Sequence, residues 1–481
     1  MTGAASNATS SYPENPRCTA VQKSEQIMQG TITRSLFVGL ALSLAGCASY
    51  APQPLPTQID LPQSVLAIPV NPAQLPFRRP GSHLFNPADG LDIDEVAMLA
   101  VANNPQLRQA RDGLGIARAQ SFAAGLLPDP QLGITSDHPT NGTMGNTNAF
   151  NLNLNYDVSA LLLRSSRTGS ATAAEQQINL DLLWQEWQVV SQARLLFVRL
   201  TTQQRLLAQL EDARRLFADR YQRSQQALAD GNVTSDFASA DLAALQNAER
   251  QINDLERGRL QNHASLCNLL GIAPGASLDL VGEPSPPAID TAAVRANLEQ
   301  LLDRRPDMRA LQAGYHSQEE KFRGAVLAQF PALNVGITRA RDTSGLYTRG
   351  FGVSLSLPIF NANRGNIAIE KTTRKKLFDE YQDRLNSAYS EIDTALANLS
   401  LLQDQLQRTQ QGVVEFSTVA RNAESAYRAG NLTAPDYVRL KTALLDKQTE
   451  SINLQESLME QQIALETLLG PDLPEQNGSK K

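Results

Sequence analysis

The chain has 481 residues, of which only 5% are aromatic, and a formal net charge of −6. Few aromatic residues among many Ala, Leu, Gln and Arg residues are typical of long helices and not of a compact α/β enzyme. Because no block of Lys and Arg occurs, we expect no nucleic-acid partner. No run of about 18 consecutive apolar residues occurs, so a conventional membrane-spanning helix is not predicted.

A targeting signal is predicted at the N-terminus. Arg34 precedes the apolar run LFVGLALSLA, which ends in Leu44–Ala45–Gly46–Cys47, as a secretory signal does. These last four residues resemble the bacterial lipobox, whose cysteine is lipidated and becomes the first residue of the mature chain. We therefore predict a lipoprotein signal peptide over residues 1–46 and an acylated, for example palmitoylated, Cys47. Met28 would give a signal of ordinary length, which makes an over-extended start upstream of it an alternative.

A tether is predicted after the signal. It covers residues 47–84 and begins ASYAPQPLPTQIDLPQ, a Pro-rich composition that favours an extended, unpacked chain. Ala48 rather than Asp follows the cysteine, which, by resemblance to bacterial lipoproteins, favours the outer membrane. Cys18 would leave with the signal and Cys267 lies alone in an apolar helical run, so we predict no disulfide and a buried Cys267.

Two stretches alternate with a period of two. Phe150–Asp157 reads FNLNLNYD, and from Phe351 the chain reads FGVSLSLP. Each predicts a strand with one apolar and one polar face. Leu132–Thr135 and Val335–Thr338 are predicted to be the first strands of the two hairpins, which gives four strands in the chain.

Each pair of strands is followed by a long helical run. The runs cover about 164–229 and 364–429, and at 1.5 Å per residue each would be roughly 100 Å long. They end at Gly231–Asn232–Val233–Thr234 and Gly430–Asn431–Leu432–Thr433, where Gly suits a helix end and Thr suits the start of the returning helix. The first run carries an apolar seam with spacings of three and four that predicts long helix packing: Leu180, Leu183, Trp187, Val190, Phe197, Leu200, Leu207, Leu210, Phe217 and Tyr221.

The landmarks of the two halves are displaced by about 200 residues, which indicates a tandem duplication. Asn104–Pro105 corresponds to Arg305–Pro306, and the returning helices end at Gly271 and Gly470. We therefore predict a first repeat over residues 85–285, a second over 286–472 and a disordered tail over 473–481.

The hairpins require several chains if their apolar face meets lipid. Strands in a bilayer must close into a barrel because no backbone group can be left unpaired there. Known membrane barrels begin at about eight strands, so four cannot close alone, whereas three chains would supply twelve. A soluble helical bundle would explain the seam equally well, but not the two hairpins.

The sequence resembles the TolC-like outer-membrane factors (outer membrane efflux proteins), in particular the lipoprotein branch of tripartite efflux systems. The resemblance rests on the segments LPIFNANRGN and RRPDMRA, the two GN(V/L)T turns and the lipobox. The resemblance covers about residues 85–472. It implies a mainly α fold with a small β part: a homotrimer that closes a twelve-stranded transmembrane β-barrel on a twelve-helix α-barrel. It also implies a passive exit duct in outer-membrane lipid, served by a periplasmic adaptor and an inner-membrane pump of the RND or ABC type. The first-half strand departs from this pattern, because it ends in YDVSALLLRSSR without an LPIF-like segment, and the cargo stays open.

The resemblance also assigns roles at the helix tips. It implies that the adaptor docks at Gly231–Thr234 and at Gly430–Thr433. It further implies a periplasmic gate that includes Asp436, near the second tip, and we add Asp236, with Arg439 and Tyr427 as polar links. The alternative for both acids is a purely local role, since carboxylates are favoured at helix N-termini.

Catalytic chemistry is not predicted. His83, His138, His263 and His316 are scattered, and Gly113 and Gly115 lie mid-helix without the strand that a dinucleotide fingerprint needs. We expect no enzyme activity, no cofactor and no metal site. The remaining alternative to a channel is a periplasmic coiled-coil lipoprotein scaffold without channel activity.

Overall fold

The computed structural model describes residues 50–72, 75–77, 85–140, 145–284, 289–298 and 304–471. The predicted signal peptide with Cys18 and Cys47, His83 and the predicted tail at 473–481 lie outside the described residues. The chain divides into two units, residues 1–60 and 61–481. Residues 50–60 form neither helix nor strand, and every element named below belongs to the second unit.

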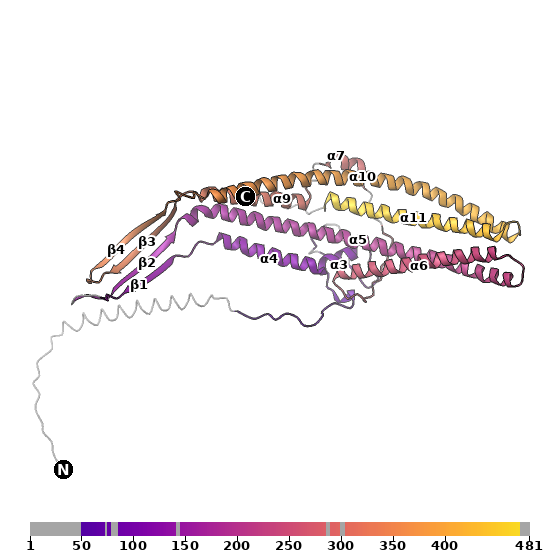
Figure 1. Cartoon of the computed structure of the whole chain (residues 1–481), viewed down its shortest axis with the longest axis horizontal. Helices are drawn as coiled ribbons and strands as arrows, with labels where there is room; N and C mark the ends of the chain where they lie inside the picture. Colours follow the sequence, from indigo (N-terminus) through magenta and orange to yellow (C-terminus); the bar gives the residue numbers. More distant parts are fainter. Residues whose placement is uncertain are drawn as a thin grey trace, which may run out of the picture. The chain divides into compact units, whose positions relative to one another are not determined.

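The second unit contains the predicted long helices and four strands, and its two halves repeat one order of elements (Figure 1). The first half contains the 3₁₀ turn η1 (Val65–Ala67), α3 (Ile93–Asn103), α4 (Pro105–Gly125), β1 (Gln131–Asp137), β2 (Ala149–Asp157), α5 (Ser159–Ala229) and α6 (Ser235–Leu270). The second half contains α7 (Thr291–Ala296), α9 (Pro306–Leu327), β3 (Ala332–Arg341), β4 (Tyr347–Ser356), α10 (Arg364–Arg428) and α11 (Ala434–Leu469). The predicted fold class is confirmed at the level of one chain. Among the described residues no helix is both long and apolar enough to cross a bilayer.

The strands form one antiparallel sheet in the order β1-β2-β3-β4. Within the second unit the sheet lies at one end of the helices, and the turns α5–α6 and α10–α11 lie at the other (Figure 1). We call α5 with α6 the first helix pair and α10 with α11 the second. The seam predicted on α5 is buried at Trp187, Val190, Phe197, Leu200, Leu210 and Phe217 and partly buried at its other positions.

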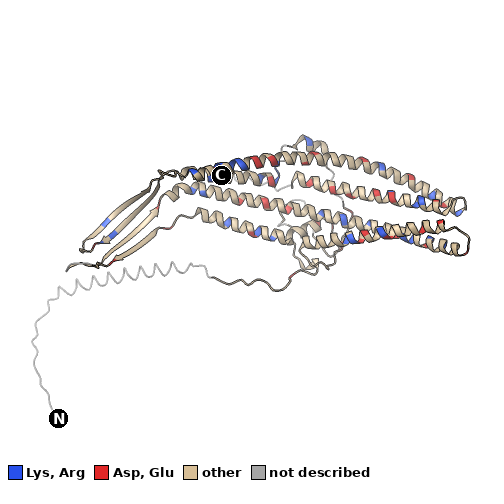
Figure 2. Cartoon of the chain, viewed as in Figure 1, with Lys and Arg blue, Asp and Glu red and all other residues tan. Residues whose placement is uncertain are grey.

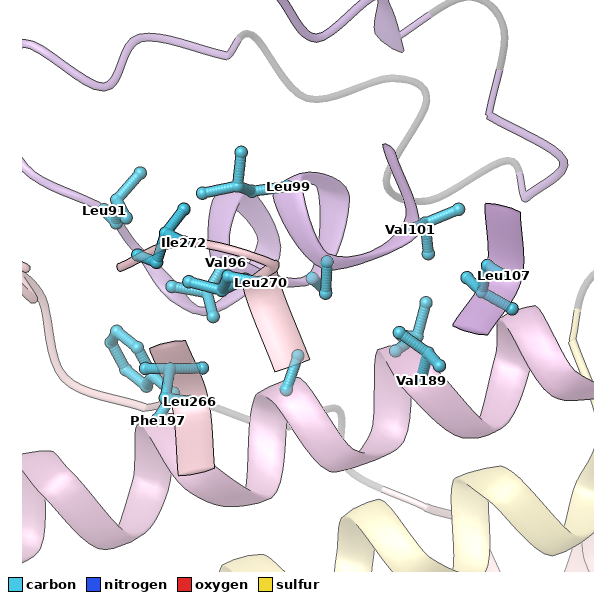
Figure 3. Close-up of a cluster of buried hydrophobic side chains, with 14 of the residues drawn as sticks. Leu91, Val96, Leu99, Val101, Leu107, Val189, Phe197, Leu266, Leu270 and Ile272 are labelled. Carbon is cyan, nitrogen blue, oxygen red and sulfur yellow. The ribbon is translucent and has the colours of Figure 1, made fainter. Parts of the chain in front are cut away.

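The largest apolar core lies where α3, α4 and the end of α6 meet the middle of α5 (Figure 3). Leu99, Phe197 and Leu266 are almost completely buried in it, as is Cys267, which confirms the prediction of a buried cysteine. Near this core, and at the matching place in the second half, a side chain binds a helix-end carbonyl. The Asn104 amide donates to the Leu269 carbonyl (2.8 Å), and Arg305 at the matching place donates to the Leu468 carbonyl (3.0 Å). Such bonds satisfy carbonyls that a helix C-terminus leaves unpaired.

The prediction of an extended, unpacked tether over residues 47–84 is wrong for the described residues between 61 and 77. Val65, Ile68 and Phe77 are buried in the core just described, and the Phe77 ring lies 5.2 Å from the Trp187 ring. The backbone also bonds to the core, since the Ala273 amide donates to the Pro62 carbonyl (3.0 Å). The Pro-rich composition concealed these widely spaced apolar side chains, whose burial outweighs the preference for an extended, solvated chain.

Candidate channel surfaces and helix tips

The sheet has one apolar and one polar face, because residues paired across antiparallel strands point to the same side. An apolar row crosses all four strands: Leu132 pairs with Leu154, Leu154 with Ile337, and Ile337 with Phe351. Each of these side chains is exposed, Phe351 to 70%. An exposed apolar surface of this extent within one sheet marks contact with lipid or with another protein.

The opposite face is polar, and its only charged residues among the described strands, Asp137 and Asp157, stand at the ends of β1 and β2. Asn153 pairs with Gly133, and Asn155 pairs with Gly336. The Asn155 amide donates to Asn153 Oδ1 (3.1 Å). A Cβ placed on Gly133 or Gly336 would lie 2.6 Å or 2.1 Å from an asparagine Oδ1, so the two glycines make the room that the asparagine row occupies. Between these two aspartates the face offers hydrogen bonds without charge, which suits a water-filled passage.

Both helix tips end in the same hydrogen-bonded turn. The Gly231 amide donates to the Leu228 carbonyl (3.0 Å) and the Asn232 amide to the Ala227 carbonyl (2.8 Å). Gly430 and Asn431 repeat these two bonds, and both glycines have a positive φ, +75° and +76°. This is the Schellman motif, which needs a left-handed residue at that place. Neither glycine has a neighbour near its Cβ direction, so both tips present open backbone.

Asp436 lies in a local cap at the start of α11. The Thr433 hydroxyl donates to Asp436 Oδ2 (2.7 Å), and Arg439 Nη2 donates to Asp436 Oδ1 (3.2 Å). Asp236, in the first turn of α6, is exposed, and its carboxylate makes no hydrogen bond among the described residues. Within one chain, therefore, neither carboxylate links the two helix pairs, and Arg439 reaches only its own helix.

Tyr427, by contrast, belongs to a cluster that joins the two helix pairs. Its ring is stacked on Tyr437, with centroids 5.0 Å apart and planes 12° apart. The guanidinium carbon of Arg220, on α5, lies 5.0 Å from each of these ring centroids. Arg220 Nε in turn donates to Asp241 Oδ1 on α6 (3.2 Å), and both of these side chains are buried. A cation held against two rings is an attractive contact, strengthened by burial.

Charged residues also border this cluster on the second helix pair. Lys441 Nζ lies 5.6 Å from the Tyr437 centroid and donates to Glu424 (3.1 Å). The hydrogen bond and charge of Lys441 lower the pKa of Glu424 below its ordinary value. The sequence interpretation missed Arg220, Asp241, Tyr437 and Lys441. Arg220 itself carried a signal, because it follows Phe217 by three residues on the apolar seam.

Farther from the tips, α5 meets α11 through polar side chains. Arg199 Nε donates to Glu460 (2.5 Å), and Gln209 donates to Gln448 (3.4 Å). Burial, and then the charge of Glu460, raise the pKa of the neighbouring Glu456 to about 7, against the opposing effect of Arg199. The two helix pairs therefore meet across a surface that combines charge pairs with an apolar cluster, to which Leu210 and Val438 belong.

Among the described residues, no group of three or more His, Cys, Asp and Glu side chains could hold a metal ion. The described histidines stay apart from the tips: His138 follows β1, His263 lies on α6 and His316 on α9.

Comparison with known proteins identifies the class to which this fold belongs. The structure of the Campylobacter jejuni CmeC outer membrane channel matches with a TM-score of 0.68 at 17% identity, over 90% of this chain and 96% of that one. The fold is therefore that of outer-membrane channels. Residues 297–471 match the model of the outer membrane efflux protein family.

Its curated relatives extend the similarity over the first half of the chain. The probable outer membrane lipoprotein SilC of Salmonella typhimurium is 24% identical over 468 residues, which span 90% of this chain and 98% of the relative. The cation efflux system protein CusC of Escherichia coli K12 is 25% identical over 464 residues, 90% of this chain and 97% of the relative. The resemblance inferred from the sequence motifs is thus confirmed as a similarity to outer membrane efflux proteins.

Proposed function

We propose that the protein is the outer-membrane exit duct of a tripartite efflux pump and that it conducts its cargo passively. The observation that carries the proposal is the sheet with one exposed apolar face and one polar face that is charged only at Asp137 and Asp157, at the strand ends. In a bilayer the apolar face contacts lipid and the asparagine and glycine face lines water. Because the lining is uncharged between the strand ends, this stretch holds no charged cargo tightly, and cargo selection falls to the pump.

The chain functions as a homotrimer in this proposal. The outer strands β1 and β4 each have one unpaired edge in a single chain. Edges of this kind are not stable in lipid, and pairing β4 of one protomer with β1 of the next removes them. We expect the mass of the detergent-solubilised protein, after subtraction of detergent, to be about three times that of the mature chain. A conducting monomer would contradict this prediction.

The periplasmic adaptor is proposed to dock at the two tips, and the inner-membrane pump acts through it. The open backbone at Gly231 and Gly430 supports this role, because apart from the adjacent residues no described atom lies within 4 Å of the Cβ position of either glycine. Bulky charged substitutions at Val233 and Leu432 should stop export and leave the trimer intact. Export that survives both changes would place docking elsewhere.

The gate is proposed to lie beside the tips. Tyr427 and Tyr437 hold the second helix pair to Arg220 of the first, and three copies of this link would keep the tube narrow. In the trimer, Asp436 and Asp236 would each form a ring of negative charge that faces the axis, and Arg439 would partly neutralise Asp436. Lipidated Cys47 would anchor the chain in the inner leaflet beside the barrel.

Channel recordings test the main proposal. Purified protein in a planar lipid bilayer should conduct ions in discrete steps, and a deletion strain that carries the gene should regain export of the pump's cargo. The alternative, a periplasmic lipoprotein scaffold, predicts no conductance under any condition. A scaffold has no use for the apolar row on the strands, which is why the channel is preferred.

A further inference from the structure

Three arginines lie together on the apolar face of the sheet. Arg339 on β3 pairs directly with Arg349 on β4, and Arg341 follows on the same face, paired with Tyr347 and with Phe150 of β2. All three lie toward the β3–β4 turn, which is the end of the strands away from the helices (Figure 2). Like charges directly across two strands destabilise their pairing. An arginine pair at this place therefore needs a compensating anion.

The described residues supply no such anion. Arg339 and Arg349 are exposed, and neither guanidinium group makes a hydrogen bond or an ion pair within the described residues. Asp137 ends β1 on the other face, because its neighbour Ser136 is the residue that pairs with Phe150. Asp342 accepts three bonds inside its own turn, from the Ser344 amide and hydroxyl and from the Leu346 amide. The segment 138–148 contains neither Asp nor Glu.

A neighbouring protomer would not supply the anion either. In the proposed trimer, β1 of the next chain lies beside β4, and the side chains that β1 presents on this face are Leu132, Ile134 and Ser136. The positive charge therefore remains whichever register the two edge strands adopt.

The arginines stand at the end of an apolar groove. Its volume is about 540 Å³, and Leu152, Leu154, Ile337 and Phe351 line it together with Arg339 and Arg349. Gly350 also borders the groove and contributes no side chain. Arg341 is held in place, since its guanidinium carbon lies 5.7 Å from the Phe150 ring and 5.9 Å from the Tyr347 ring, and it donates to the Asn148 carbonyl (2.6 Å). A groove with this composition fits an acyl chain, and its cationic end fits an anionic headgroup.

We propose that Arg339, Arg349 and Arg341 bind the phosphate groups of lipopolysaccharide, with one of its acyl chains in the groove. The proposal rests on the channel function above, which places the β3–β4 turn at the outer leaflet, where lipopolysaccharide is the phosphate-bearing lipid. Guanidinium groups bind phosphate oxygens with two parallel hydrogen bonds, which an ammonium group cannot do. Basic clusters beside apolar membrane surfaces recognise anionic headgroups in the same way.

The test measures binding of bisphosphorylated lipid A to the purified trimer in detergent by native mass spectrometry. Arg339→Gln/Arg349→Gln should weaken binding roughly 10- to 30-fold, at about 1 kcal/mol for each charge. Arg339→Lys/Arg349→Lys should bind with intermediate affinity. The control Arg215→Gln/Arg257→Gln removes two exposed helix arginines and should bind as the wild type does.

Three comparisons could overturn the proposal. Equal lipid A binding by the double Gln variant would refute the site. Equal binding of phosphatidylglycerol, or displacement of lipid A by millimolar inorganic phosphate, would refute lipopolysaccharide as its ligand. Without lipid, the melting temperature of the double Gln variant should be no lower than that of the wild type, because the variant lacks the like-charge pair. When lipid A is added, only the wild type should gain stability. Conductance is measured in parallel, and its absence from the wild type would refute the channel function. If the wild type conducts but the double Gln variant binds lipid A as the wild type does, only the lipid site is refuted.

Discussion

The link between the helix pairs at the tips can be weakened without disturbing the charge pair beneath it. We consider Tyr427→Leu/Tyr437→Leu, which keeps apolar bulk and removes both rings. The Arg220 guanidinium carbon lies 5.0 Å from each ring centroid, and these two contacts cross from the first helix pair to the second. The stacking of the two rings on each other lies within the second pair, so its loss affects the closed and open gate equally.

The size of the effect follows from the burial of the rings. Tyr427 is 38% exposed, so its cation–π contact is worth about 0.5–1 kcal/mol, whereas Tyr437 is 5% exposed and its contact is worth about 2 kcal/mol. Together the variant should lose about 2.5–3 kcal/mol of closed-state stability in each protomer. The ratio of open to closed gates should therefore rise roughly 70- to 160-fold per protomer.

Single-channel recording measures this ratio as open probability and as mean conductance. The matched control is Tyr427→Phe/Tyr437→Phe, because phenylalanine keeps the π-face and neither tyrosine hydroxyl has a hydrogen bond among the described residues. The control should behave almost as the wild type does. If the open probability and conductance of the Leu variant equal those of the wild type, the cluster does not hold the gate closed. If the Phe control opens as often as the Leu variant does, the hydroxyl groups and not the rings form the link.

Three further predictions concern single side chains. The pKa of Glu456 is raised from 4.5 to about 7, so its ionisation destabilises the folded state, and stability should fall as the pH rises from 4.5 to 7. Glu456→Gln should therefore reduce the change in melting temperature between pH 5 and pH 8. If the variant shows the same change as the wild type, Glu456 is not its source. Asp436→Ala should reduce cation selectivity and block by trivalent cations, whereas unchanged recordings would leave Asp436 as a helix cap only. Cys47→Ser should abolish acyl labelling and leave the signal uncleaved, and continued labelling would contradict lipidation at Cys47.

Local patterns in the sequence were sufficient to predict the strands and the tips. The alternation over Phe150–Asp157 matches β2, because a strand with two different faces shows its period within eight residues. The tip glycines were predictable for a similar reason, since a left-handed residue at a helix end favours glycine whatever surrounds it. The start of β3 was less predictable: the strand begins at Ala332, three residues before the predicted Val335. Strand ends depend on the neighbouring strand as well as on local pattern.

The cluster around Arg220 could not be predicted in the same way. It joins α5 to residues more than 200 positions later, and no local period indicates which helix faces which. What the sequence did contain was a charge on an apolar seam, three residues after Phe217. A buried arginine requires a partner, so this position indicated a contact without naming Asp241 or the tyrosines.

The arrangement of this cluster has a consequence for how the proposed gate could open. Asp241 neutralises Arg220 from within the first helix pair, while only the rings belong to the second. When the pairs separate, the ion pair stays whole and no uncompensated charge is left behind, which would cost about 3–5 kcal/mol. Higher on the helices the bond between Arg199 and Glu460 does cross from one pair to the other, and breaking it would separate opposite charges. We therefore expect the tips to part while the helices remain joined at the level of Glu460, so that opening is a local spreading of the tips about that level.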